Sequence, residues 1–339
     1  MQSKRIVWVD QAKAFLIFCV VYGHVGIFTM NGYQGLFSRI LDVFCMPMFF
    51  FLSGMFLKSQ LGISYYFANI LRKIKQLIIP FVFCGISFTI LCCTDMPWWS
   101  LFWYPGGESH NGYWFLLVLF ELHLLFIIIQ LIVKALHIKN LGGIFAFYAV
   151  VCISLLLISY LKLIPEEPWA TILSFHRIHY NFPFFILGYY FKNNIDNISL
   201  IITTPRTYTI ATTIFLLLFF IRDRFEIRGW PIDYIIIVCA LVSIIYILNK
   251  YGSKLPFAST INYVGQHTLD IYVLHYFFIP KNLMALKPLV FSDYMKDYNI
   301  LVDFVLSSSI AIIVVGVSLV VSKLLSQNKI FNMAFLGKF

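Results

Sequence analysis

Long apolar runs, separated by short polar segments, set the pattern of this chain. Several runs approach or exceed the roughly 20 apolar residues that a helix needs to cross a bilayer, and the strict alternation typical of a membrane β-barrel is not seen. Because lipid offers no partner to an unpaired backbone group, each run is expected to be helical. We predict an all-α, polytopic membrane bundle of about ten transmembrane helices, at residues 14–31, 40–57, 77–94, 113–133, 142–161, 181–192, 207–221, 231–249, 261–280 and 300–322.

The composition also indicates a membrane protein. Of the 339 residues, 60% are hydrophobic and 12% are charged, whereas soluble domains average about 25% charged residues. No polar segment between the runs is long enough to fold by itself, so residues 1–339 are predicted to form a single transmembrane domain without a separate soluble domain. The basic amino terminus leads into the first run without a convincing cleavage site, and we expect no cleaved signal.

Lysines and arginines are distributed unevenly between the two predicted sides. With a cytoplasmic amino terminus, 16 of the 25 fall in inside segments and nine in outside segments. The positive-inside rule expects this asymmetry, so both termini are predicted to be cytoplasmic and the protein to lie in the inner (plasma) membrane. Orientation, together with anionic lipids or an anionic cofactor, accounts for the formal charge of +10 without nucleic acid.

Cysteine and histidine spacing gives little support for a metal or a disulfide framework. The seven cysteines are an odd number, lie mostly inside predicted spans and form no Cys-x-x-Cys pair. His176 and His179 have the spacing of a weak metal pattern, but no third ligand is evident. We expect His176 to contact a substrate on the outer face or to be an interface residue, and we predict no metal.

The first run carries two polar residues at a suggestive separation. Lys13 follows Asp10, and His24 lies eleven residues further on, after an otherwise apolar stretch. In a helix this spacing puts the histidine about 16 Å deeper than the lysine. An ionisable residue inside a span indicates function, and the depth suits a ligand with an anionic head and a reactive tail. The alternative is that Lys13 anchors the helix and His24 is an ordinary packed histidine.

Further polar residues fall inside later runs. Glu121 lies well within the fourth predicted span, where a carboxylate needs a partner or water. The ninth span carries His267, Asp270, Tyr272 and His275. So many polar groups in one span indicate a polar interior cavity rather than a helix that faces lipid.

Two segments near the predicted cytoplasmic and outer faces have alternative interpretations. Arg72, Lys73 and Lys75 precede Pro80 and suit phosphate binding, although for this cluster alone a topology anchor is the better explanation. The outer segment 95–113, followed by Trp114, is rich in tryptophan and glycine. It suits either an interfacial aromatic belt or the binding of a sugar ring.

Taken in order, these motifs resemble the acyltransferase-3 family of membrane acyltransferases, which includes sugar O-acetylases. The resemblance spans about 260 residues and rests on the set rather than on any one motif. Two positions depart from the family pattern: Lys13 stands where arginine is frequent, and Tyr113 where leucine is frequent. The motifs are Lys13 to Gly23-His24, Phe51-Leu-Ser-Gly54, Arg72 to Lys75 before Pro80, Trp114-Phe-Leu116, Phe182-Pro-Phe-Phe-Ile-Leu-Gly188 and Gly265-Gln-His-Thr-Leu-Asp-Ile-Tyr-Val-Leu-His275.

The resemblance implies about ten spans and an O-acyltransferase that uses acyl-CoA, usually acetyl-CoA, from the cytoplasm. The acceptor would be a hydroxyl of an envelope glycan or a lipid-linked sugar, with membrane lipid and other envelope-biosynthesis proteins as partners. His24 is expected to act as general base or to carry the acyl group. The candidate residues are His24, Glu121 and His275 for catalysis, Lys13, Ser53, Arg72, Lys73 and Lys75 for the donor, and Asp10, Trp114, His176 and Tyr272 for the acceptor.

Two other function classes stay open from the sequence. A transporter or exporter of a glycan or lipid intermediate would use the buried polar residues to line a path. A membrane sensor or partner subunit of envelope synthesis would lose its function when its complex is disrupted. Transport without acyl-CoA would favour the exporter, and dependence on assembly would favour the subunit.

Overall fold

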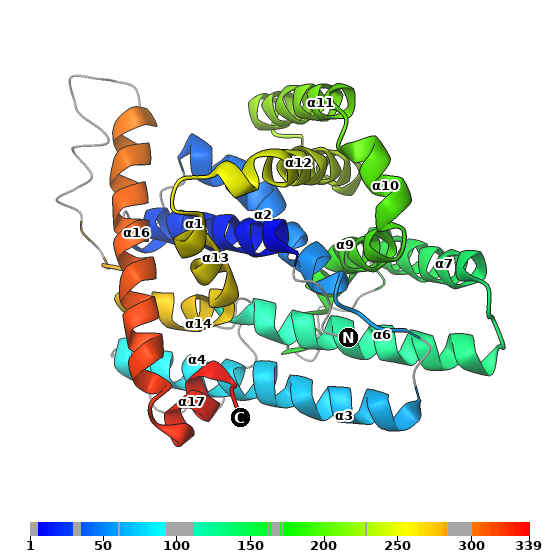
Figure 1. Ribbon diagram of the computed structural model, residues 1–339, viewed down its shortest axis with the longest axis horizontal. Coiled ribbons are helices and arrows are strands. Elements are labelled where there is room, and N and C mark those ends of the chain that lie inside the picture. Colours follow the sequence, from blue (N-terminus) through cyan, green and yellow to red (C-terminus); the bar gives the residue numbers. More distant parts are fainter. Residues whose placement is uncertain are drawn as a thin grey trace. The chain divides into compact units, whose positions relative to one another are not determined.

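Helices make up the architecture of this protein, and the part of the chain that the structure describes contains no β-strand (Figure 1). The all-α prediction is therefore confirmed. The predicted aromatic loop 95–113 lies outside the described residues except for Gly112 and Tyr113. The computed structural model describes residues 6–29, 35–59, 62–92, 112–161, 163, 170, 172–227, 229–281, 283 and 300–339.

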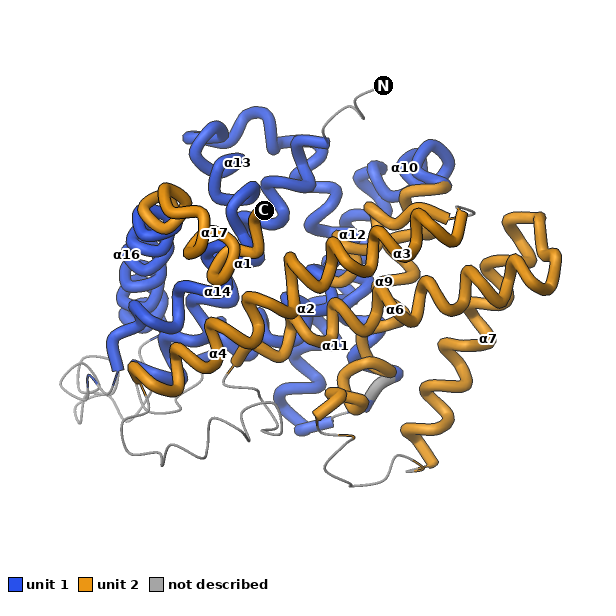
Figure 2. Tube along the Cα trace, turned by 90° about the horizontal axis from the view of Figure 1, so that it is seen from below, with its two compact units in different colours: residues 1–49, 194–322 blue, residues 50–193, 323–339 orange. Residues whose placement is uncertain are grey.

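The helices group into two compact units (Figure 2). Unit 1 comprises residues 1–49 and 194–322, and unit 2 comprises residues 50–193 and 323–339. The helices of unit 1, two of which extend into unit 2, are α1 (Val7–Thr29), α2 (Leu36–Gly54), α10 (Ile195–Ile202), α11 (Pro205–Arg224), α12 (Trp230–Tyr251), the short η4 (Gly252–Lys254), α13 (Ala258–Gln266), α14 (Thr268–Phe278) and α16 (Ile300–Leu325). Those of unit 2 are α3 (Ile63–Lys73), η1 (Ile74–Ile78), α4 (Ile79–Cys92), α6 (Trp114–Ala135), α7 (Leu141–Tyr160), α9 (Phe175–Asn193) and α17 (Lys329–Leu336).

Seven stretches of described helix are long and apolar enough to cross a membrane, or eight if the bent pair α10–α11 is one span. They are α1, α2, the continuous α3–η1–α4, α6, α7, α12 and α16. Of the remaining predicted spans, 181–192 falls in α9, which begins earlier, at Phe175. A multi-pass helical membrane bundle is thus supported, with fewer qualifying helices than the ten predicted.

The predicted ninth span, 261–280, is interrupted in the structure. It consists of two short helices, α13 and α14, which meet at His267. His267 ends α13 with a tight turn, because its backbone N–H donates to the carbonyl of Val264. Its side chain then binds the carboxylate of Asp270 in the first turn of α14. These local bonds satisfy backbone and side chain at the break, so two elements replace the single helix that hydropathy predicted.

The predicted third span, 77–94, is longer than expected. One continuous helical stretch runs from Ile63 to Cys92, and it includes the basic segment before Pro80. A π-helical turn, η1, occupies Ile74–Ile78, just before that proline. Proline has no N–H to donate to the carbonyl four residues back, and a local change of helix type is a known response to such a gap. The basic residues therefore belong to a helix, not to a loop.

Glycines bring helices of unit 2 into close contact. A Cβ atom on Gly54, at the end of α2, would overlap the carbonyl oxygen of Phe185 on α9. A Cβ on Gly188 would in turn overlap the carbonyl oxygen of Phe51. The absence of a side chain at Gly54 and Gly188 thus lets the two backbones approach closely.

In unit 1, α1 packs beside α13 and α14 (Figure 1). Gly265 of α13 lies against the backbone of α1, where a Cβ would overlap the carbonyl oxygen of Asp10. The next residue of α1, Gln11, donates its amide Nε2–H to the carbonyl of Gly252, at 2.9 Å. This packing holds α14, and the histidine it carries, beside the C-terminal part of α1.

Candidate functional site

Two histidines meet in unit 1, one from each of two helices far apart in the sequence. His24 Nδ1 on α1 lies 2.9 Å from His275 Nε2 on α14. The two rings are stacked, with centroids 5.1 Å apart and 13° between their planes. The hydroxyl of Tyr276 lies 3.3 Å from the other ring nitrogen of His24, Nε2. Hydropathy singled out both histidines separately, and the fold brings them into direct contact.

A backbone carbonyl determines which histidine nitrogen is free to accept a proton. His275 Nδ1 lies 3.1 Å from the carbonyl oxygen of Ile271, which can only accept a hydrogen bond. In the neutral ring the proton is therefore on Nδ1, and His275 Nε2 is an acceptor. His24 must then donate from its own Nδ1, which leaves the lone pair on Nε2. That lone pair faces the Tyr276 hydroxyl, which donates to it.

The first turn of α14 is held in place by buried polar contacts. Asp270 is 1% exposed, and its carboxylate accepts hydrogen bonds from Ser322 Oγ at 2.7 Å and from His267 Nδ1 at 3.0 Å. Buried polar groups that are fully bonded favour a single arrangement of the chain around them. The sequence predicted Asp270 and His267 only as polar residues of one span. In the structure they pair with each other at the start of α14, before His275.

Aromatic rings surround the histidine pair. Phe28 packs edge-on against His24, and the Tyr276 ring lies 4.0 Å from the His275 ring between centroids. Tyr272 also belongs to this cluster, at 5.9 Å from the His275 ring, and it is buried. Aromatic rings around two bonded imidazoles restrict the access of water to His24 Nε2.

Lys13 and Asp10 lie in the same unbroken helix as His24. The sequence predicted one helix from the lysine to the histidine, and α1 confirms it by running from Val7 to Thr29. Asp10 is buried beside Gly265, and Lys13 is half-buried. Eleven residues of helix separate the lysine from the histidine by about 16 Å along the axis.

Glu121 is a buried carboxylate of unit 2, on α6. Both of its oxygens are enclosed, and neither has a hydrogen-bond partner among the described residues. Two positions on, His123 has a different environment, with Nδ1 bonded to the carbonyl of Leu119 at 2.7 Å. A buried carboxylate that the protein leaves unpaired is a common feature of functional sites.

The predicted acceptor residues of unit 2 lie near the start of two helices. Trp114 begins α6, and the guanidinium of Arg177 from the first turn of α9 lies 4.1 Å from its ring centroid. His176, next to that arginine, is exposed. The tryptophan face is thus covered by a cation, a stabilising arrangement in its own right.

The predicted donor cations of unit 2 also have neighbours within the protein. Arg72 donates from Nη2 to Asn69 Oδ1 at 2.8 Å, and Lys75 Nζ lies 4.7 Å from the ring centroid of Phe339. Both side chains are exposed, whereas Lys73 and Ser53 are half-buried. Exposed cations held by weak contacts stay available to an anion.

Sequence reasoning missed Tyr276 and the carbonyl of Ile271. Adjacent residues on a helix point about 100° apart, so periodicity gave no reason to place Tyr276 beside His24. The one available signal was its position directly after His275. Within the described residues, no three histidine, cysteine, aspartate or glutamate side chains are gathered as metal ligands would be.

Comparison with known families gives one match. A family model described as an acyltransferase domain, that of the acyltransferase-3 family, matches residues 6–326, nearly the whole chain. It spans every residue of the histidine pair and of the basic segments. Comparisons with curated proteins and with solved structures gave no match.

Proposed function

The chain belongs to the acyltransferase-3 family, and from this membership we propose that it transfers an acetyl group from cytoplasmic acetyl-CoA to a hydroxyl of an envelope glycan or lipid-linked sugar. The observation that carries the proposal is the hydrogen-bonded chain from Ile271 through His275 to His24. It leaves one imidazole lone pair, on His24 Nε2, among aromatic side chains. The family match does not favour an exporter.

In this proposal His24 acts as the general base. Its Nε2 takes the proton from the acceptor hydroxyl while that oxygen attacks the thioester carbonyl carbon. His24 then returns the proton to the sulfur as the carbon–sulfur bond breaks, so the histidine ends in its starting state. The Tyr276 hydroxyl, which binds Nε2 at 3.3 Å, is displaced by the acceptor hydroxyl in this step.

His275 acts through His24. When His24 is protonated at both nitrogens, its Nδ1–H still donates to His275 Nε2. The bond to the Ile271 carbonyl keeps His275 in the tautomer that accepts. A catalytic base that is held in orientation by a third group is found in enzymes of unrelated folds.

Charge along α1 supports acetyl-CoA as the donor. Lys13 lies toward the predicted cytoplasmic end of the helix, where it suits a phosphate group of CoA. The 16 Å or so between Lys13 and His24 leaves room for an extended arm that reaches inward. In unit 2, the proposed donor-binding residues are Arg72, Lys73 and Lys75, which suit a phosphate group, and Ser53, which can donate a hydrogen bond from its hydroxyl.

The acceptor assignment rests on the aromatic residues. Trp114 and the exposed His176 are proposed to contact a sugar, because aromatic faces and polar edges suit a pyranose ring. Asp10 and Tyr272 are also proposed to contact the acceptor. Glu121 is proposed to take part in proton transfer. The proposed location is the inner membrane.

The first experiment measures acetyl-CoA binding and thioester turnover with detergent-purified protein. We expect His24→Ala to bind acetyl-CoA but to lose turnover by about 10²–10⁴-fold, the usual contribution of a general base. We expect Lys13→Ala to weaken binding. The exposed His137 on a left-handed backbone position provides a matched control, His137→Asn, which should behave as wild type.

Several outcomes would redirect the proposal. Full glycan acetylation by folded His24→Ala would overturn it. A burst of acyl-enzyme in wild type, lost in His24→Ala, would make His24 an acyl carrier instead of a base. Flux of a glycan lipid through proteoliposomes without acyl-CoA would favour the exporter.

A further inference from the structure

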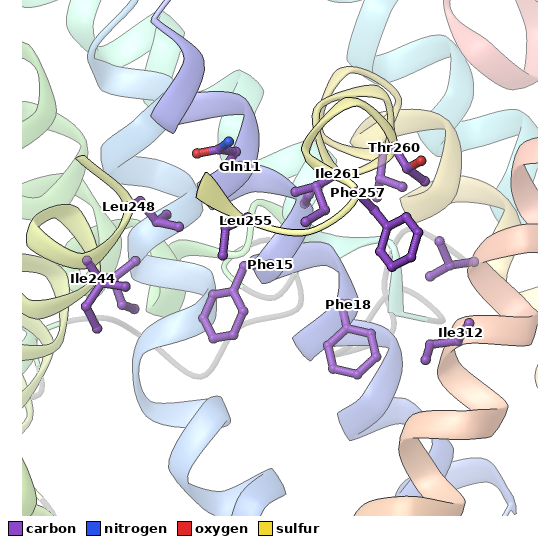
Figure 3. Close-up of a pocket in the computed structure, with 14 residues that line it drawn as sticks. Gln11, Phe15, Phe18, Ile244, Leu248, Leu255, Phe257, Thr260, Ile261 and Ile312 are labelled. Atoms are coloured by element: carbon purple, nitrogen blue, oxygen red, sulfur yellow. The ribbon is translucent and has the colours of Figure 1, made fainter. Parts of the chain in front are cut away.

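An apolar groove of about 540 Å³ runs beside α1 in unit 1 (Figure 3). Side chains from α1, α12, α13 and α16 line it, and only Gln11 and Thr260 among them carry a polar group. Figure 3 shows Phe15 and Phe18 on one side, Ile244 and Leu248 on another, and Phe257 and Ile312 opposite. The volume lies in the range of about 300–1,000 Å³ usual for ligand sites.

The groove belongs to the membrane-spanning part of the chain. Three of its walls, α1, α12 and α16, are candidate spans. Rim residues are exposed although apolar, with Ile312 at 62% and Phe257 at 81%. Phe257 also has a left-handed backbone, φ 58°, which is costly for a bulky side chain and fixes its position at the rim. Ile312 lies within the candidate span α16, so its exposed apolar side chain faces hydrocarbon. A cavity lined by apolar side chains does not hold water.

The groove is separate from the histidine pair. Phe15 and His24 are nine residues apart, or two and a half helical turns, so they lie on opposite sides of α1. Neither His275 nor Tyr276 lines the groove. Its occupant therefore does not react at His24, and the groove serves another purpose.

One end of the groove is polar and basic. Gln11, in the second turn of α1, is buried; its Nε2 donates to Gly252, and its Oε1 has no hydrogen-bond partner in the described part of the chain. Lys250 and Lys254 are exposed in the segment that leads into Leu255, a lining residue. No carboxylate lines the groove. With the predicted orientation this end lies at the cytoplasmic headgroup level, where anionic lipids attract lysines.

We propose that this groove binds one acyl chain of an anionic glycerophospholipid, such as phosphatidylglycerol. The acyl chain occupies the apolar length between Phe15, Phe18 and Ile312. The phosphate pairs with Lys254, which is exposed next to the lining residue Leu255. This lipid is a resident partner, independent of the acyl transfer.

Native mass spectrometry of the delipidated full chain tests the proposal. Phosphatidylglycerol and phosphatidylcholine with identical chains are titrated separately. Wild type should bind one phosphatidylglycerol saturably and at least tenfold more tightly than phosphatidylcholine. Ile312→Trp, which fills the groove from its rim, should weaken binding at least tenfold. Its matched control is Ile313→Trp, because Ile313 is equally exposed, at 64%, but does not line the groove.

A second pair of variants tests the headgroup contact. Lys254→Gln should remove most of the preference for phosphatidylglycerol, whereas Lys134→Gln, an exposed lysine of unit 2, should not. A photoreactive acyl chain on wild-type protein gives a readout that needs no variant, and its adducts should map to Phe15, Phe18 or Phe257.

Three results would overturn the proposal. Equal binding by Ile312→Trp and Ile313→Trp would mean that the groove holds no specific chain. Equal binding of the two phospholipids by wild type would reduce it to a surface covered by bulk lipid. Displacement of bound phosphatidylglycerol by a polyisoprenyl phosphate at lower concentration would assign the groove to a lipid-linked substrate.

Discussion

Among single residues, the carbonyl of Ile271 determines which nitrogen of His24, the proposed base, accepts a hydrogen bond. The carbonyl fixes the tautomer of His275, and His275 fixes that of His24. Each step follows from the rule that a neutral imidazole has one donor and one acceptor nitrogen. The proposed catalytic role of His24 thus depends on His275, which lies 251 positions away in the sequence.

This dependence makes a testable prediction for His275. We expect His275→Ala to lower kcat by about 10²-fold or more with little change in the KM for acetyl-CoA, because the orientation of the base is lost. His275→Gln should recover part of the activity, since its amide oxygen can accept from His24 Nδ1–H. Steady-state kinetics on purified protein measures both. Equal activity of the alanine and glutamine variants would show that His275 only fills space.

For pairs of elements, close packing depends on glycine. The end of α2 and the middle of α9 approach through Gly54 and Gly188, each placed against a carbonyl oxygen of the other helix. Membrane helices use small residues in this way because the hydrophobic effect does not drive their association in lipid. Both glycines stand in motifs quoted from the sequence, but only the structure shows that they face each other.

Gly188→Ala tests this contact. Its Cβ would overlap the Phe51 carbonyl, which is backbone and cannot rotate away, so we expect a loss of about 1–3 kcal/mol or more in the free energy of unfolding. Gly142→Ala on α7 is the control, because nothing lies within 4 Å of its added Cβ. Chemical unfolding in detergent compares the two. If both variants are as stable as wild type, α2 and α9 are not held by this contact.

For the whole molecule, the number of membrane crossings decides which side each terminus occupies. The described helices include seven that qualify as spans, or eight with the bent pair α10–α11, whereas hydropathy alone predicted ten. An even number returns the chain to its starting side, and an odd number does not. The lysine and arginine distribution favours an even number, with both termini in the cytoplasm.

Reporter fusions test this topology. A fluorescent protein that matures only in the cytoplasm, joined to either terminus, should be bright in both cases, because 16 of the 25 lysines and arginines then lie inside. A phosphatase active only outside serves as the opposite control at each terminus. A bright amino-terminal fusion with an active carboxy-terminal phosphatase would contradict the prediction and indicate an odd number of crossings.

The sequence by itself determined the class of the protein. Apolar run length and low charge required a helical membrane bundle, because lipid leaves a chain few other ways to pair its backbone. The spacing of Lys13 and His24 correctly placed both in one helix. The ordered motifs identified the acyltransferase-3 family, and the family match confirmed it.

Only the tertiary structure decided how these pieces act together. Hydropathy is read locally, so it could not show the break at His267, which rests on side-chain bonds to Asp270. Nor could it show that His24 and His275 touch, or that Tyr276 faces the reactive nitrogen. Such contacts join residues that are distant along the chain, and their geometry follows from helix packing and not from any local pattern.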